Sequence, residues 1–174
     1  MQTILRRILP VAAGLVAIAF AMEVKTDYDH KADFSRYRTY SWLQAKASDS
    51  LWEDRMMGAV DSQLAAKGWT KVASGGDASV AAIGTTRTEP TFTTFYNGFP
   101  GWYWHGFGTT TATTTVDYER VGTLVVDVFD SSTKKLIWRG VAHDTLSSKP
   151  EKNDRKLEEA AEKMFDHFPP KSKG

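Results

Sequence analysis

The sequence predicts an α+β domain, with a mostly antiparallel sheet of about six strands and two amphipathic helices packed on one face of it. Two patterns support this prediction. Short stretches alternate apolar and polar residues with a period of two, which is typical of strands, and two longer stretches repeat apolar residues at steps of three and four, which is typical of helices. Because each helix has a single apolar stripe, one face of a sheet can cover both helices.

The chain begins with short elements. Alternation of apolar or β-branched side chains with charged ones predicts a first strand over residues 24–28. Residues 33–37 predict one helical turn, and residues 38–42 predict a second short strand.

The first long helix is predicted over residues 51–67. Ser50 is placed to cap its N-terminus and Glu53 to close a capping box, while Gly68 is the expected stop signal. The apolar stripe of this helix consists of Trp52, Met56, Ala59, Val60 and Leu64.

The middle of the chain is predicted to be extended, apart from one unusual segment. Strands are predicted over residues 69–72 and, after a turn, over residues 78–88. Residues 92–108 then combine eight aromatic side chains with four glycines and follow neither period, so we expect a loop or a distorted hairpin tip there. A Thr-rich strand is predicted over residues 109–118, with a bend at residues 119–122.

The clearest strand pair is predicted over residues 123–129 and 136–143. The register that gathers their apolar residues on one face also sets Asp127 opposite Arg139. We interpret these two residues as a structural ion pair on the less buried face of the sheet.

The last helix is predicted to begin at residue 150 or 153 and to end at residue 168, before two prolines. Residues 171–174 are expected to be a disordered tail. The apolar stripe of this helix consists of Leu157, Ala160, Ala161, Met164, Phe165 and Phe168.

Residues 1–21 have the pattern of a bacterial secretory signal peptide. Arg6 and Arg7 precede a short apolar run, and Ala19-Phe20-Ala21 closes this run as a cleavage site. The run is shorter than the roughly 20 apolar residues of a membrane span, so we expect cleavage, with retention as an anchor as the alternative. Residues 22–170 are then expected to be a single domain in the periplasm or outside the cell.

The composition excludes several kinds of partner and linkage. The chain has no cysteine, so it can form no disulfide and can carry no lipid on a cysteine. Its 22 basic and 21 acidic residues nearly balance, so we expect no basic surface that would bind nucleic acid.

Three blocks of sequence are similar to those of a known family. They are VKTDYDHKADFSRYRTYSW at residues 24–42, GTLVVDVFDSSTKKLIWRGVAHDTL at residues 122–146, and KMFDHFPP at residues 163–170. Together with the Gly/aromatic segment between them, they resemble the bacterial envelope family called domain of unknown function 4136. The resemblance implies an exported α+β domain that is often lipid-anchored through a cysteine at the first mature position. Met22 stands at that position here, so lipid anchoring does not carry over, and the family supplies no catalytic residues.

The sequence lacks the motifs of common catalytic and metal sites. It has no cysteine nucleophile, no G-x-S-x-G elbow and no glycine-rich phosphate loop. No two histidines have the local spacing of metal ligands. We therefore expect no catalytic residue, no cofactor and no metal.

The aromatic segment has the clearest functional content. Flat aromatic faces stack on sugar rings, Trp and Tyr settle at membrane interfaces, and both are frequent at the centres of protein–protein contacts. The structural alternative is that the rings fold back over the edge of the sheet. The candidate binding residues are Tyr96, Phe99, Trp102, Tyr103, Trp104 and Phe107.

The sequence thus favours an exported, soluble periplasmic domain that binds or scaffolds in the cell envelope without catalysis. Its partner would be an envelope protein or a glycan, and peripheral contact with the membrane is left open. One alternative is a homo-oligomeric structural component, with the aromatic segment between copies. The other is an envelope hydrolase acting on glycan or peptide, which a pocket holding two of Asp127, Asp144, Glu119 and His143 would favour.

Overall fold

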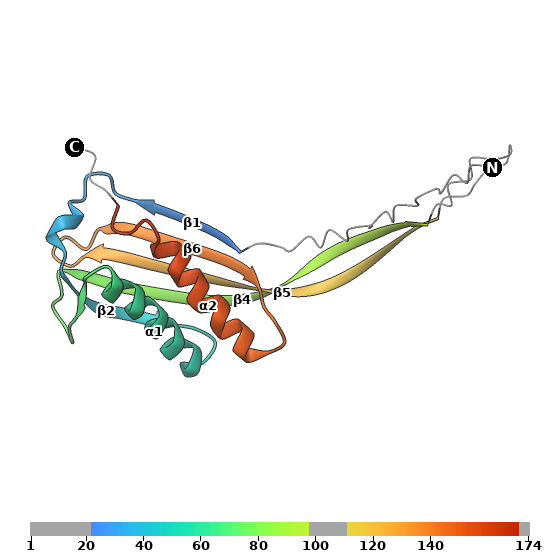
Figure 1. Cartoon of the computed structure of the whole chain (residues 1–174), viewed down its shortest axis with the longest axis horizontal. Coiled ribbons are helices and arrows are strands. Elements are labelled where there is room, and N and C mark those ends of the chain that lie inside the picture. Colours follow the sequence, from blue (N-terminus) through green and yellow to red (C-terminus); the bar gives the residue numbers. More distant parts are fainter. Residues whose placement is uncertain (1–21, 98–110, 171–174) are drawn as a thin grey trace, which may run out of the picture.

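The computed structural model describes residues 22–97 and 111–170, which form one six-stranded sheet, two α-helices and one short 3-10 turn (Figure 1). The predicted signal peptide and tail lie outside the described residues. The elements are β1 (Glu23–Tyr28), η1 (Phe34–Arg36), β2 (Thr39–Lys46), α1 (Ser50–Ala66), β3 (Thr70–Lys71), β4 (Ala78–Asn97), β5 (Thr111–Asp130), β6 (Leu136–Thr145) and α2 (Pro150–Phe165).

The sheet and the helices form two layers. Both helices lie side by side on one face of the sheet, α1 over β2 and β4, and α2 over β6 and β1 (Figure 1). We call this the covered face and the opposite one the open face. The two helices also contact each other, so the covered face is closed by a continuous helical layer, as the predicted apolar stripes require.

The sheet is mixed, which corrects the prediction that it is mostly antiparallel. Its strand order is β1-β6-β5-β4-β2-β3. The pairs β1–β6, β6–β5 and β5–β4 are antiparallel, whereas β4–β2 and β2–β3 are parallel. The parallel pairs arise because α1 carries the chain back over the covered face between β2 and the strands that follow. Alternation along a strand reports which face is buried and not the direction of the neighbouring strand, so the sequence did not reveal this crossover.

The core lies between the helices and the covered face. Val80, Val126 and Val128 of the sheet are fully buried, and so are Val60 and Leu64 of α1. An aromatic cluster continues the core at the end where α2 stops, and its rings meet mostly edge to face. The cluster consists of Phe34, Tyr37, Trp69, Trp138, Phe165 and Phe168.

The N-terminus of α1 differs in detail from the prediction. Asp49, not Ser50, is the capping residue, and its carboxylate accepts a hydrogen bond of 3.0 Å from the Trp52 N–H. Glu53 accepts a hydrogen bond from the Ala47 N–H instead of reaching back to the cap. The sequence offered two adjacent capping residues, and the path of the chain out of β2 selects the first of them.

The last helix is shorter than the prediction that extends it to residue 168. It begins at Pro150 and ends at Phe165, and Phe168 follows the helix but remains buried in the aromatic cluster. Phe168 therefore contributes to the core from the turn after the helix.

The turn from β5 to β6 is organised by Asp130. Its Oδ1 accepts hydrogen bonds from the backbone N–H and the hydroxyl of both Ser132 and Thr133, at 2.6–3.0 Å. Its Oδ2 accepts a hydrogen bond of 2.9 Å from the Tyr37 hydroxyl. These hydrogen bonds, with that from the Ser132 hydroxyl the largest contributor, hold the pKa of Asp130 well below its usual range. Burial, together with Asp130, raises the pKa of Tyr37 to about 12.

Strands β4 and β5 are longer than the sequence indicated. The predicted strand over residues 78–88 continues to Asn97, and the expected bend at residues 119–122 is absent because β5 is one continuous strand. Residues 92–97, predicted to be loop, are therefore strand. The rest of the aromatic segment, from residue 98, lies outside the described residues.

Candidate functional site

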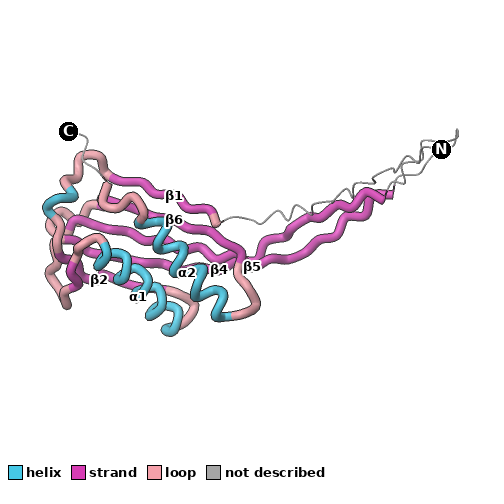
Figure 2. The backbone as a smooth tube through the Cα atoms, in the orientation of Figure 1, coloured by secondary structure: helices cyan, strands magenta, loops and turns pink. Residues whose placement is uncertain are grey.

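A two-stranded arm extends from one end of the sheet. Strand β2 pairs with β4 only as far as Ile83, and β6 pairs with β5 only as far as Val121. Beyond these residues, within the described chain, β4 and β5 pair only with each other, without a register shift, out to Asn97 and Thr111. We call residues 84–97 and 111–120 the arm and the rest of the described chain the body. Figure 2 shows the arm leaving the body as a twisted ribbon of two strands.

One face of the arm is apolar and exposed. Pro90 pairs with Tyr118 and Phe92 pairs with Val116, so these four side chains share a face. Tyr118 is 73% exposed, Phe92 is 67% exposed and Val116 is 42% exposed. Monomeric proteins rarely gather apolar side chains on an exposed ribbon without a use for them, so this face is a candidate interaction surface.

The other face of the arm is polar and mostly acidic. Glu89 stands directly opposite Glu119, and Asp117 lies one pair further out, opposite Thr91. Arg87 forms an ion pair with Glu89, which offsets part of this charge. The arm is therefore amphipathic, with an apolar face and an acidic face. Along the outer half of the arm, no described part of the body covers either of these faces.

The two edges of the arm are not equivalent. The Leu146 N–H donates a hydrogen bond of 2.7 Å to the Arg120 carbonyl, so the backbone of Arg120 faces the outer edge of β5. Because backbone groups alternate along an antiparallel strand, the backbone groups of Val116 and Tyr118 face the same edge. Pro90, paired with Tyr118, then directs its ring nitrogen to the outer edge of β4. Proline cannot donate a hydrogen bond, so it blocks the edge of β4 and leaves that of β5 open to another strand.

The predicted binding residues relate to this arm as follows. Tyr96 lies on β4 opposite Ala112, near the end of the described part of the arm. The other five, Phe99, Trp102, Tyr103, Trp104 and Phe107, lie outside the described residues. The structure adds Phe92, Val116 and Tyr118, which the sequence analysis did not select. Their signal in the sequence is the alternation of large side chains with threonine or acidic residues, over residues 91–93 and 115–119.

Asp127 and Arg139 lie in the middle of the open face, on neighbouring strands and directly opposite each other. The ion pair is bidentate, with Arg139 Nε 2.6 Å from Asp127 Oδ1 and Nη2 2.7 Å from Oδ2. The hydrogen bonds that Arg139 donates to Asp127, together with the negative charge of Asp127, raise the pKa of Arg139. Both oxygens of the carboxylate are thus used by one partner within the sheet, which fits a structural role.

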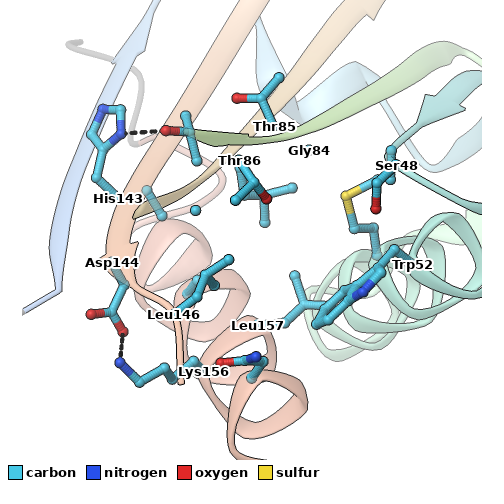
Figure 3. A pocket seen from close by; sticks show the side chains of 18 of the residues that line it. Ser48, Trp52, Gly84, Thr85, Thr86, His143, Asp144, Leu146, Lys156 and Leu157 are labelled. Atoms are coloured by element: carbon cyan, nitrogen blue, oxygen red, sulfur yellow. Dashed lines mark hydrogen bonds and ion pairs between the residues drawn. The ribbon is translucent and has the colours of Figure 1, made fainter. Parts of the chain in front are cut away.

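A pocket of about 350 Å³ lies at the base of the arm, between the covered face and the first turns of both helices (Figure 3). We call it the base pocket. Its walls include Trp52 and Met56 of α1, Leu157 of α2, and Leu146 from the segment before α2. Around this apolar interior lie charged side chains, namely Asp49, Arg120, Asp144 and Lys156, and the imidazole of His143.

His143 and Asp144 both line the base pocket, which is the co-location that a hydrolase would need. They are neighbours on β6, however, and successive side chains of a strand point to opposite faces. His143 Nδ1 lies 2.8 Å from the Thr123 hydroxyl, and Asp144 forms an ion pair of 2.9 Å with Lys156 of α2. Figure 3 shows the two side chains directed apart. They therefore do not converge on a common point where a substrate could react.

Neither a metal cluster nor a membrane-spanning helix is found among the described residues. No group of three His, Asp or Glu side chains in this part of the chain is arranged to hold a metal ion. None of the described helices has the length and apolarity needed to cross a membrane.

Comparison with known proteins agrees with the resemblance seen in the sequence. Residues 24–170 match the family described as Domain of unknown function (DUF4136). The chain belongs to this family. None of the curated proteins is similar enough in sequence to count as a relative.

Among solved structures, matches to this DUF4136 protein are found at low sequence identity, and one of them shares its fold. A PDZ domain protein from Parabacteroides distasonis matches with a TM-score of 0.59 and 13% identity, over 88% of this chain and 37% of that chain. This chain therefore spans little more than a third of that protein. A PelC dodecamer from Paraburkholderia phytofirmans matches with a TM-score of 0.46 and 11% identity, over 83% of this chain and 93% of that chain.

Proposed function

We propose that this protein is an exported, soluble domain of the cell envelope that binds or scaffolds a partner protein through its arm, without catalysis. Export is supported by the signal-like pattern of residues 1–21. The observation that carries the binding role is the arm itself, because two strands leave the body, expose apolar side chains and keep one backbone edge open.

The chemistry of the arm favours a polypeptide partner over a glycan. The open edge of β5 presents backbone donors and acceptors, which a partner strand satisfies by pairing. The apolar face then supplies Val116 and Tyr118 next to that edge, where they would pack against alternate side chains of the added strand. A second copy of this chain could supply such a strand, so the homo-oligomeric alternative concerns the same edge.

Site-specific crosslinking in living cells tests this proposal. A photoreactive phenylalanine analogue replaces Tyr118 on the arm, and the matched control carries it at Leu51, which is 65% exposed on α1 in the body. We expect a discrete crosslinked product from position 118 and none from position 51.

The mass of the product separates the alternatives. A crosslinked product whose mass is that of this chain plus that of a different protein supports the proposal. A product with twice the mass of this chain supports the homo-oligomer. Equal crosslinking from the two positions, or crosslinking from Leu51 alone, would show that the arm is not the binding element.

A further inference from the structure

We propose that the base pocket binds a single acyl chain, with the anionic head of the amphiphile held by Arg120 at the rim. This site lies on the covered face, apart from the open edge of β5, so the inference does not depend on the partner protein proposed above. It rests on the shape and lining of the pocket and on Arg120, a cation in that lining that forms no ion pair with a described residue.

The interior of the pocket suits hydrocarbon. Trp52, Met56, Leu146 and Leu157 contribute apolar surface from two helices and one connecting segment. Figure 3 shows Trp52, Leu146 and Leu157 around the same space, across from Gly84 and Thr86 on β4. Its volume of about 350 Å³ is within the range of small-molecule sites. Transfer of an acyl chain from water into such a space is favourable because it removes apolar surface from water.

Two glycines shape the wall that the sheet provides. A Cβ atom at Gly84 would lie 2.7 Å from Met56 Sδ, and one at Gly122 would lie 2.8 Å from Leu146 Cδ2. The absence of side chains at these positions lets Met56 and Leu146 lie directly on the sheet. The ends of the Met56 and Leu146 side chains can change rotamer, so this wall of the pocket can adjust to an acyl chain.

One cation at the rim is available to an anionic head. Lys156 is already engaged by Asp144, at 2.9 Å, and by the Thr145 carbonyl. Asp49 directs its carboxylate at the Trp52 N–H of α1. Arg120 is exposed and forms no ion pair with any described residue. Of the two cations in the described lining, Arg120 is therefore the one free to pair with the head of a ligand.

The helix ends do not add a further attraction. The N-terminus of α1 is already capped by the Asp49 carboxylate, which accepts a hydrogen bond from the Trp52 N–H. In α2, the described lining residues lie mainly beyond the first turn, where the partial charge of a helix end has fallen off. A carboxylate or phosphate ester at the rim would thus be held by Arg120.

The test is calorimetric titration of the protein with dodecanoate below its micelle concentration. We expect saturable binding of one molecule per chain, and weaker binding of dodecyltrimethylammonium, which has the same chain with a cationic head. Arg120→Glu is expected to weaken dodecanoate binding about fivefold and to reduce the preference for the anion. The matched control is Arg87→Glu, at the base of the arm but on its opposite face, which should bind dodecanoate as the wild type does.

A second variant pair tests the interior. Thr86 is exposed and lines the base pocket, so Thr86→Trp should fill part of it and weaken binding about tenfold or more. Thr115→Trp, on the other face of the arm, should have no effect. Non-saturable uptake, equal binding by all variants, or equal binding of the two head groups would overturn the proposal. A dimer in sedimentation that binds no dodecanoate would also overturn it, since a second copy would then fill the pocket.

Discussion

The body and the arm use the same two strands in opposite ways. In the body, β4 and β5 lie at the centre of the sheet, with strands on both sides and helices over one face, and Val80, Val126 and Val128 are fully buried. In the arm, beyond residue 87, β4 and β5 pair only with each other among the described residues, and Phe92 and Tyr118 are mostly exposed. An isolated two-stranded hairpin is at best marginally stable. The apolar residues of the arm are therefore expected to contribute little to folding, which is consistent with the binding role proposed above.

The largest expected effect compares one substitution in the two regions. Phe165 is fully buried and packs against Trp138, with ring centroids 4.8 Å apart. Phe165→Ala should lower the free energy of unfolding by about 3–5 kcal/mol, because it removes buried surface and leaves a cavity. Phe92→Ala removes the same side chain from the arm. This substitution should change the free energy of unfolding by less than about 0.5 kcal/mol. Urea unfolding of the two variants measures both values, and similar losses would mean that the arm belongs to the folding core.

A smaller effect is expected at the turn that Asp130 holds. Asp130→Asn should lower the unfolding free energy at pH 7 by about 1–3 kcal/mol, because the amide cannot accept the same set of hydrogen bonds. The carboxylate has a lowered pKa in the folded state, so its contribution is complete above the unfolded pKa of about 3.9 and falls as the pH drops below that value. The difference between wild type and variant should therefore be smaller at pH 3 than at pH 7.

Urea unfolding at both pH values checks this prediction. Asp29→Asn is the control, because Asp29 also lies in a turn and accepts a hydrogen bond from the Lys31 N–H. The difference in unfolding free energy between wild type and Asp130→Asn could instead be the same at pH 7 and pH 3. That result would mean that the charge of Asp130 does not stabilise the turn.

The sequence predicted the body better than the arm, for a physical reason. Packing against helices imposes a period on each strand, so residues 123–129 and 136–143 could be placed and Asp127 could be set opposite Arg139. The arm packs against no other described element along its outer half, so its apolar residues are not selected for burial. Their alternation is short on each strand, and the aromatic residues from position 92 onward therefore appeared as an irregular segment. The base pocket was missed because it joins Trp52, Gly122 and Leu157, which are far apart in the chain.

Excision of the arm tests the central claim that the arm binds while the body folds by itself. Residues 90–118 are replaced by Asn-Gly, which joins Glu89 to Glu119 through a two-residue hairpin turn and keeps Arg120 and the base pocket. The measurement is thermal unfolding together with co-purification of the partner that crosslinks at position 118. We predict a melting temperature within a few degrees of the wild type and complete loss of the partner. Retention of the partner by the arm-less protein, or collapse of the body when the arm is removed, would contradict this account.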